Sequence, residues 1–379
     1  MPLLYVSHLT LHNFRSYADV DVPLEAGVTA FIGRNGQGKT NLVEAIDYLS
    51  RLSSHRVATD APLVRAGSDQ AIVRAAVVKD GRTAVLEVEL NPGRANRGRI
   101  NKSTLPKVRD LVGLVRTVIF SPEDLTLVKG DPSDRRHFLD DLLVLRTPRL
   151  AGTRADYDRV LKQRNSLLKS ARFGNRQGAL ATLGVWDAHL ARVGAELLDE
   201  RLRLVDELRP YVGRAYETVA RGASRDDAKI TYKSSIPSLA ELVEKPDRAA
   251  LTDALMAEVE RRRDDELDRG ISLVGPHRDE LVLALGDLAA KGYASHGESW
   301  SFALALKLAS FDLLRDDGDD PILILDDVFA ELDTERRRQL AELVAGAEQV
   351  LVTAAVAADV PEVLAGVRYV VGDGEVTRD

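Results

Sequence analysis

Residues Phe31–Ile46 read FIGRNGQGKTNLVEAI and contain the stretch that decides the fold, Gly33–Thr40. This stretch matches the pattern G-x-x-x-x-G-K-[ST] at every fixed position. Glycines let successive backbone N–H groups curl around a phosphate, and the helix that starts there adds the positive end of its dipole. An apolar strand, Val28–Ile32, precedes the loop, and a helix is expected over 41–52. The sequence therefore predicts a nucleotide-binding P-loop.

Two residues of this loop carry the chemistry that we expect. Lys39 would reach the β- and γ-phosphates of ATP as a catalytic residue, and Thr40 would place its hydroxyl on Mg²⁺. The other loop residues would surround the phosphates, mainly with backbone N–H groups; they are Gly33, Arg34, Asn35, Gly36, Gln37 and Gly38. The alternative interpretation is an ordinary turn that carries a surface lysine.

A P-loop also needs an acid for the metal, and the run PILILDD at Pro321–Asp327 supplies two. Its apolar residues, Ile322–Leu325, predict a buried parallel strand. We expect Asp326 to hold Mg²⁺ through water and Asp327 to orient or activate the attacking water as a catalytic residue. The alternative is an acidic turn that continues the preceding acidic run. The long separation between loop and acids is typical of ABC-type ATPases that act on DNA.

Length and composition exclude several classes of protein. A chain of 379 residues is longer than one core usually grows, so two lobes are expected. The chain has no cysteine, which excludes disulfides and thiol nucleophiles and suits a reducing cytosol. The sequence contains no signal peptide pattern and no run near the roughly 18 apolar residues of a membrane span. We therefore expect a cytoplasmic protein that is not integral to a membrane.

The net charge of −7 is unevenly distributed along the chain. Arg94–Arg116 contains seven Lys/Arg and one Asp, and Lys129–Arg176 contains twelve Lys/Arg and six Asp. Such basic stripes can follow a nucleic-acid backbone, or they can be solvated faces. The composition leaves both interpretations open.

The order of sequence patterns predicts the domain organisation. Strand patterns fill most of residues 1–32, and Asp80-Gly81 within Ala71–Leu90 predicts a β-hairpin. From about 133 to 270 the spacing of apolar residues is mainly helical, with a short strand near 227–235. The predicted fold class is α/β: an ABC-type P-loop ATPase head built from both chain ends, 1–118 and 271–379, with an inserted, mainly helical arm over 119–270.

Several blocks of the chain resemble the RecF family of bacterial DNA replication and repair proteins, which is related to SMC heads and other ABC-type ATPases. The blocks are LTLHNFRSY (Leu9–Tyr17), GRNGQGKTNLVEAI (Gly33–Ile46), SPEDLTLVKGDPSDRRHFLD (Ser121–Asp140), GPHRDEL (Gly275–Leu281) and LILDDVFAELD (Leu323–Asp333). The resemblance implies ATP and Mg²⁺ as ligands, ATP-dependent head-to-tail homodimers, and DNA binding at gaps and at junctions between single and double strands. It also implies RecR, RecO and RecA as pathway partners, a role in the SOS response, and a weak DNA-stimulated ATPase activity.

The resemblance gives a role to Ala294–Glu298, ASHGE, which takes the place of the ABC signature LSGGQ. In such proteins the loop contacts a γ-phosphate held by the second subunit, because a helix N-terminus attracts anions. Ser295 would donate its hydroxyl, and Gly297 would let the backbone approach closely. Asp333, in AELD, resembles the D-loop residue that crosses the dimer interface.

Some positions depart from the family pattern. His296 and Glu298 replace a glycine and a glutamine of the signature, and a carboxylate close to a γ-phosphate is repulsive unless it turns outward. Trp300 stands where family members often carry a basic residue. Thr353 is followed by alanines where many ABC proteins place a phosphate-contacting histidine, and Asp327 replaces the more usual glutamate. We therefore expect intact ATP binding and dimerisation with slow hydrolysis.

Five further residues are candidates with open roles. Arg15 and Arg56 are expected either to contact nucleotide phosphates or to form surface salt bridges. Arg135 and Arg136 either face DNA or brace the arm, and the sequence does not separate these roles. His277 is either a structural residue or a nucleotide contact.

Two other function classes remain alternatives at this point. One is the nucleotide-binding subunit of a membrane transporter, against which stand the helical insertion and the basic stripes. The other is a P-loop kinase that acts on a small molecule, which would have no need of the ASHGE stretch.

Overall fold

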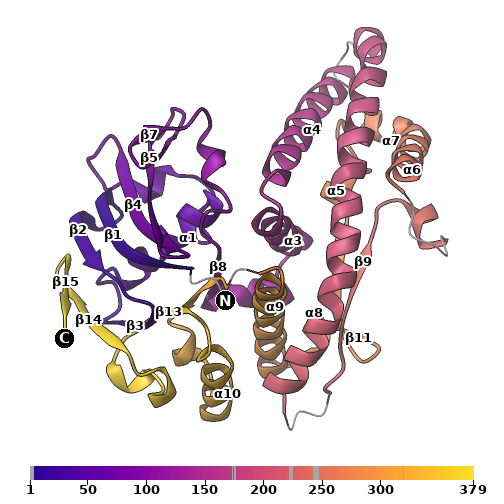
Figure 1. The fold of residues 1–379 in the computed structure, drawn as a ribbon. Coiled ribbons are helices and arrows are strands. Elements are labelled where there is room, and N and C mark those ends of the chain that lie inside the picture. The colour runs from indigo at the N-terminus through magenta and orange to yellow at the C-terminus, as the bar shows by residue number, and fades with distance from the viewer. Residues whose placement is uncertain (1–3, 173, 175, 222–224, 242–246, 319) are drawn as a thin grey trace. The chain divides into compact units, whose positions relative to one another are not determined.

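The computed structural model describes residues 4–172, 174, 176–221, 225–241, 247–318 and 320–379 (Figure 1). The chain divides into two compact units. The first, called the P-loop unit below, comprises Met1–Val128, Tyr211–Asp227 and Ser295–Asp379. The second, called the helical unit, comprises Lys129–Pro210 and Ala228–Ala294.

The head and arm expected from the sequence have other bounds, 1–118 with 271–379 and 119–270. A division by compactness does not test which residues act together as an ATPase head. Those bounds therefore stay a prediction.

One six-stranded sheet of the P-loop unit is antiparallel, in the order β2-β1-β4-β5-β6-β7. The expected hairpin is confirmed, because Lys79 pairs with Arg82 across the Asp80-Gly81 turn. The strands are β1 Leu4–Phe14, β2 Tyr17–Pro23, β4 Ala71–Lys79, β5 Arg82–Leu90, β6 Arg97–Ile100 and β7 Ser103–Thr104.

The other six-stranded sheet joins both ends of the chain, in the order β15-β14-β3-β13-β12-β8. Its strands run parallel except for β15 at the edge. They are β3 Gly27–Ile32, β8 Thr117–Phe120, β12 Ile322–Asp326, β13 Gln349–Ala354, β14 Val367–Gly372 and β15 Glu375–Arg378. Because the carboxyl ends of parallel strands meet at one edge, the P-loop after β3 is placed near the two acids at the end of β12.

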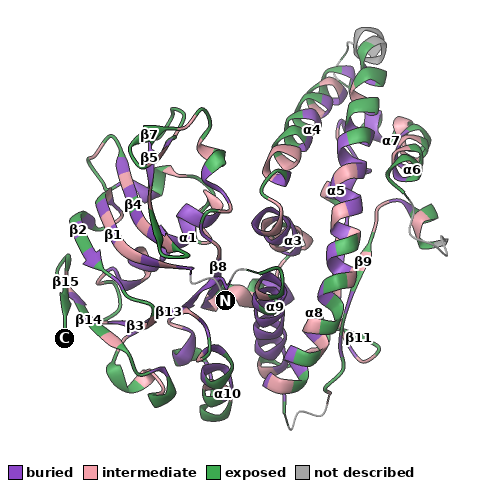
Figure 2. Cartoon of the chain, viewed as in Figure 1, coloured by how far each residue is buried: buried purple, intermediate pink, exposed green. Residues whose placement is uncertain are grey.

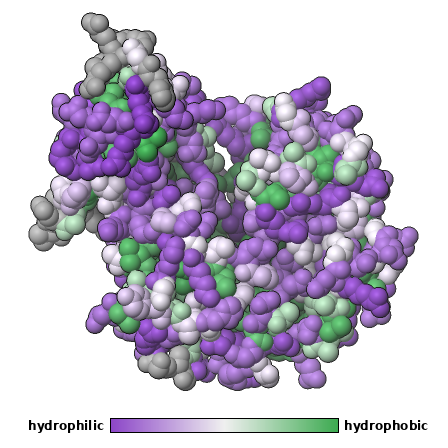
Figure 3. Space-filling model, turned by 180° about the vertical axis from the view of Figure 1, so that it is seen from behind, coloured by the Kyte–Doolittle hydropathy of each residue, from purple (hydrophilic) through white to green (hydrophobic). Residues whose placement is uncertain are grey.

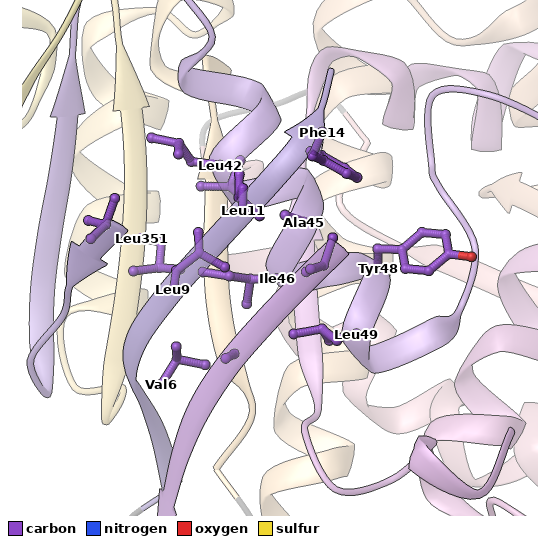
Figure 4. Close-up of a cluster of buried hydrophobic side chains, with 14 of the residues drawn as sticks. Val6, Leu9, Leu11, Phe14, Leu42, Ala45, Ile46, Tyr48, Leu49 and Leu351 are labelled. Atoms are coloured by element: carbon purple, nitrogen blue, oxygen red, sulfur yellow. The ribbon is translucent and has the colours of Figure 1, made fainter. Parts of the chain in front are cut away.

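Helix α1, Lys39–Arg51, contacts strands of both sheets. Figure 4 shows side chains of β1, such as Leu9 and Leu11, facing Ile46 and Leu49 of α1, with Leu351 of β13 nearby. These five side chains are at most 1% exposed. Burying a side chain of this size stabilises the fold by about 1.5–3 kcal/mol. The helix that follows the P-loop is thus fixed on a shared core.

Two further helices of the P-loop unit lie toward the end of the chain: one starts within the ASHGE stretch and the other follows Asp333. They are α9, His296–Asp316, and α10, Thr334–Val344, and the short α2 spans Thr126–Lys129. Figure 2 shows α9 buried along most of its length, as expected for a helix that is apolar on several faces.

The helical unit contains the expected helices and the expected short strand. Its three-stranded sheet has the order β11-β10-β9, in which β9 and β10 are antiparallel. The elements are α3 Pro132–Arg146, α4 Leu150–Arg172, α5 Arg176–Val219, β9 Ala228–Lys233, α6 Arg248–Arg261, α7 Arg263–Arg269, β10 Glu280–Leu285, β11 Leu288–Ala289 and α8 Ala290–Tyr293. Helix α5 runs on past Pro210 into the P-loop unit.

A buried arginine holds three parts of the helical unit together. Arg164 of α4 donates to Asp187 of α5 at 2.7 Å and to Glu266 of α7 at 2.6 Å, and it also donates to Ser272 at 2.7 Å. All four side chains are buried. Removing one partner of such a cluster would leave an uncompensated buried charge, so the three helices are fixed relative to one another.

The surface carries few large apolar side chains. On the face shown in Figure 3, hydrophilic residues predominate and hydrophobic residues are scattered. Scattered apolar residues are normal on a folded domain. Of the helices in the described residues, none has the length and apolar character needed to cross a membrane.

His277 gives the helical unit a pH-dependent stability. Its Nδ1 lies 2.7 Å from the Tyr157 hydroxyl and its Nε2 lies 3.2 Å from the Ser272 carbonyl oxygen. Burial lowers the pKa of His277 to about 3. An unfolded histidine has a pKa of about 6.5, so below that pH the unfolded chain binds a proton that the folded chain does not. Stability from this residue is therefore lost as the pH falls from about 6.5 toward 3.

We predict that His277→Gln flattens the pH dependence of stability. The unmodified chain should lose about 1.4 kcal/mol of unfolding free energy per pH unit below pH 6.5 from this one residue. Urea unfolding at pH 7, 6 and 5 measures the slopes, and His189→Gln, an exposed histidine of the same unit, is the control. Equal slopes in the unmodified chain and His277→Gln would contradict the prediction.

Candidate nucleotide site

The backbone of the P-loop has the special conformations that its glycines permit. Gly38 is the N-cap of α1 at φ 102°, and Gly36 lies at φ 84°. L-residues other than glycine rarely adopt such values. At Gly33 the reason for glycine is a close approach, because an added Cβ would lie 2.2 Å from the carbonyl oxygen of Val371 in β14. The loop is therefore held between the start of α1 and strand β14.

Lys39 folds its side chain back over the loop. Its Nζ lies 3.4 Å from the Arg34 carbonyl oxygen, 3.5 Å from Asn35 Oδ1 and 3.9 Å from Asp327 Oδ1. Lys39 is only 3% exposed. A buried ammonium among three oxygen atoms is placed to contact a phosphate bound in the loop.

Asp326 is the meeting point of the P-loop and β13. Its Oδ1 accepts a hydrogen bond from Thr40 Oγ1 at 2.9 Å and one from Thr353 Oγ1 at 2.7 Å. Burial raises the pKa of Asp326 above its usual value, although both hydrogen bonds act in the opposite direction. The next residue, Asp327, has φ 49° and donates its N–H to Thr353 Oγ1 at 2.9 Å. The Thr353 hydroxyl lies 2.7 Å from Asp326 Oδ1 and 3.4 Å from Asp327 Oδ1, so it contacts both acids at the end of the strand.

These side chains fit a Mg²⁺ ion that also binds phosphate. The hydroxyl of Thr40 and the carboxylate of Asp326 are oxygen donors, which Mg²⁺ prefers. No group of three or more His, Cys, Asp or Glu that could hold a metal occurs in the described residues. Mg²⁺ is commonly bound by one or two protein oxygens together with substrate phosphates and water, so this small donor set fits the ion.

Two residues of the site were missed by the sequence reasoning. Thr353 contacts both acids. The one feature of the sequence that could have indicated this role is a polar residue at the carboxyl end of a strand next to β12. Asp373, in the β14–β15 turn, donates its N–H to Gln37 Oε1 at 2.9 Å. The C-terminal hairpin thereby supports the P-loop through both Gln37 and Gly33.

Arg15 and Arg56, which lie outside α1, both contact that helix through the buried carboxylate of Glu44. Arg15 donates to Glu44 at 2.9 and 2.6 Å, and Arg56 donates to the same residue at 3.3 Å. Burial alone would raise the pKa of Glu44, but Arg15 and Ser54 hold it below its usual value. These are the salt bridges that the sequence left as the alternative role, and a contact of Arg15 with the nucleotide stays a prediction.

The ASHGE stretch forms a second cluster at the start of α9. Ser295 is the N-cap: its Oγ accepts from Glu298 N at 3.2 Å, and its N–H donates to Glu298 Oε2 at 2.8 Å. This capping box closes the first turn of the helix. Glu298 turns back onto its own helix start, and Arg225 donates to both of its carboxylate oxygens at 3.0 and 2.9 Å.

Arg336 joins Gly297 to Asp333. Asp333 is the N-cap of α10, accepts from Arg336 N at 2.9 Å and forms a salt bridge with the same side chain. The guanidinium lies over Gly297, where an added Cβ would be 3.0 Å from an Arg336 nitrogen, and it donates to Ser301 at 3.1 Å. Within the described residues, no hydrogen bond joins this cluster to Gly33–Thr40.

The basic stripe Arg94–Arg116 borders a hollow of about 680 Å³ in the P-loop unit. Arg94, Arg97 and Lys107 line this hollow and are exposed. Arg97 also lies 3.6 Å from Glu89 Oε1, and Arg99 pairs with both Glu87 and Glu89. Part of the stripe is thus available to an anionic partner, and part of it is structural.

In the second stripe two candidate arginines brace the helical unit. Arg135 donates to both carboxylate oxygens of Glu280 at 2.7 and 3.0 Å and is 5% exposed. Arg136 donates to the Asp279 carbonyl oxygen at 2.9 Å. Together with the half-buried His277 described above, these contacts fix β10 and the turn before it.

Comparison with known proteins agrees with this geometry. Residues 5–371 match the family described as the RecF/RecN/SMC N terminal domain. A curated relative from a Nocardioides species, named DNA replication and repair protein RecF, is 70% identical over 99% of this chain and 100% of the relative. The chain belongs to the RecF family. The resemblance noted from the sequence blocks is therefore confirmed.

Solved structures extend the RecF relationship to the fold. The recombination mediator protein RecF-ATP in the RecFOR pathway aligns with a TM-score of 0.89 and 27% identity, over 100% of this chain and 98% of that one. The Smc head domain from Pyrococcus furiosus aligns with a TM-score of 0.53 and 17% identity, over 100% of this chain and 96% of that chain, and shows the fold alone. The predicted ABC-type P-loop ATPase fold is confirmed.

We predict that Gly33→Ala weakens ATP binding about tenfold or more and lowers stability. The added methyl group would overlap the Val371 carbonyl oxygen, and overpacking of this kind costs about 1–3 kcal/mol. Calorimetric ATP titration and thermal unfolding measure both effects. Gly346→Ala, with no heavy atom within 4 Å of the added Cβ, is the matched control. Indistinguishable ATP affinity in the two variants would refute the close-approach argument.

Proposed function

We propose that this chain is an ATP-dependent DNA-binding protein of replication and recombinational repair. ATP would be held at Gly33–Thr40 of one copy, and Ser295 and Gly297 of a second copy would complete its binding site. ATP would thereby draw two chains into a head-to-tail dimer that binds DNA at gaps and at junctions between single and double strands. Hydrolysis is proposed to be slow and to act as a switch.

One observation carries this proposal: Thr40 and Thr353 converge on Asp326, while Lys39 lies 3.9 Å from Asp327. Thr40 and Asp326 are proposed to hold Mg²⁺, which would supply positive charge to the phosphates. Lys39 is proposed to bind the β- and γ-phosphates, and Asp327 to orient the attacking water. The solved relative named RecF-ATP supports ATP as the nucleotide.

The partners follow from the family and from the surface. The family's name supports DNA as a partner, and Arg94, Arg97 and Lys107 offer an exposed basic surface for it. Because the solved relative belongs to the RecFOR pathway, RecR and RecO are proposed partners, with RecA loading and SOS induction as the outcome. A cytoplasmic location is part of the same proposal, since the DNA of a bacterial cell lies there.

The two alternative classes are not favoured. A transporter subunit or a small-molecule kinase would not explain relatedness over 99% of the chain to a DNA replication and repair protein. A small-molecule kinase would also leave unexplained why the ASHGE stretch is built as a second cluster separate from the P-loop.

We predict that ATP, and not ADP, converts the chain from monomer to dimer and that the dimer binds gapped duplex DNA. Sedimentation with ATP, ADP or no nucleotide, each with and without DNA, measures both steps. A chain that stays monomeric at saturating ATP would contradict the proposal.

Two variants distinguish ATP binding from dimerisation. Lys39→Met should lose both dimerisation and DNA binding, because the contact to the β- and γ-phosphates is removed. Ser295→Arg should keep ATP binding and lose dimerisation, because a long cation would block the approach of the second copy. If Ser295→Arg dimerised normally, the role of Ser295 toward a second copy would be wrong.

A further inference from the structure

The acid in the ASHGE stretch is compensated by one arginine. Glu298 of α9 accepts hydrogen bonds from Nε and Nη2 of Arg225, at 3.0 and 2.9 Å, and also from the Ser295 N–H at 2.8 Å. The Glu298 side chain is 11% exposed and that of Arg225 is 28% exposed. The Ser295 N–H and then Arg225 hold the pKa of Glu298 below its usual value. The carboxylate is therefore ionised and fully engaged.

Arg225 reaches this position from a part of the sequence far from α9. It follows the end of α5 at Val219 and precedes β9, which starts at Ala228. The chain passes from the P-loop unit to the helical unit at this point. The start of α9 is thus tied to the segment that connects the two units.

Stability alone does not account for this pair. A partly exposed ion pair usually contributes about 0–1 kcal/mol to folding. Its electrostatic effect is larger where an anion is to be bound, because one uncompensated negative charge near a phosphate is strongly repulsive. A glutamine at position 298 would keep the acceptor for the Ser295 N–H without the charge, so the acid makes the arginine necessary.

We propose that Arg225 is a positioning residue for the half-site that binds the γ-phosphate of a second copy. Its guanidinium neutralises Glu298 and holds that carboxylate on the Ser295 N–H, which leaves the turn at Gly297 acceptable to an anion. This inference rests on the proposed function, because it takes the second copy's ATP as the ligand. The role of Arg225 explains how Glu298 can be tolerated next to a bound phosphate at a position where related signatures have glutamine.

The test is a charge-specific rescue of dimerisation. Arg225→Ala should weaken dimerisation with a non-hydrolysable ATP analogue about tenfold or more, the scale of one uncompensated charge near a bound phosphate. The double variant Arg225→Ala with Glu298→Gln should dimerise like the unmodified chain, and Glu298→Gln alone should do so too. Arg221→Ala, an exposed arginine of the same segment, is the matched control. Analogue affinity measured in dilute, monomeric protein should be the same in all variants.

The outcomes distinguish a failure of the role of Arg225 from a failure of the proposed ATP-dependent dimer. If the unmodified chain dimerises but Arg225→Ala dimerises equally well, the inference is overturned. It is also overturned if the loss in Arg225→Ala is not rescued by Glu298→Gln, since the pair would then be merely structural. If the unmodified chain fails to dimerise with the analogue, the proposed function falls and the inference falls with it.

Discussion

The carboxylate of Asp326 is the constraint on which the P-loop unit depends. It accepts hydrogen bonds from Thr40 at the start of α1 and from Thr353 at the end of β13, segments that lie 286 and 27 residues away. A buried carboxylate is stable only with such partners. The parallel order β3-β13-β12 brings these strand ends to one edge, so the fold and the nucleotide site require the same arrangement. The insertion of the helical unit between the two chain ends leaves this edge intact.

Charge compensation shapes both halves of the site. Three arginines, Arg15, Arg225 and Arg336, each hold a carboxylate near a segment that is proposed to meet nucleotide. Arg336 connects Asp333 with Gly297, and Arg225 connects Glu298 with the end of α5. Because these pairs fix α1, α9 and α10 before any ligand arrives, the cost of organising the site on binding is reduced.

The sequence predicted the parts of the site whose chemistry is local. A complete P-loop motif fixes Gly33–Thr40, and an apolar run that ends in two acids fixes β12. The sequence did not predict Thr353 or the pair of Arg225 with Glu298, because these contacts join residues that only the tertiary fold brings together. Arg135 illustrates the same limit: a basic residue in a basic stripe suggests DNA, but the fold supplies Glu280 as its partner. Strands β14, VRYVVG, and β15, EVTR, mix apolar residues with charged ones and lack the long apolar run that marked β12, so no strand was predicted there.

The central claim is that each ATP is shared between the P-loop of one chain and the ASHGE stretch of another. Mixing the Lys39→Met and Ser295→Arg variants tests it most directly. A mixed dimer contains one complete site, because the Ser295→Arg chain keeps an intact P-loop and the Lys39→Met chain keeps an intact ASHGE stretch. The chain has no cysteine, so a single introduced cysteine on each variant gives a specific fluorescence pair for energy transfer. The account predicts ATP-dependent energy transfer in the mixture and none within either variant alone. A mixture that associates no better than the separate variants would contradict the shared site.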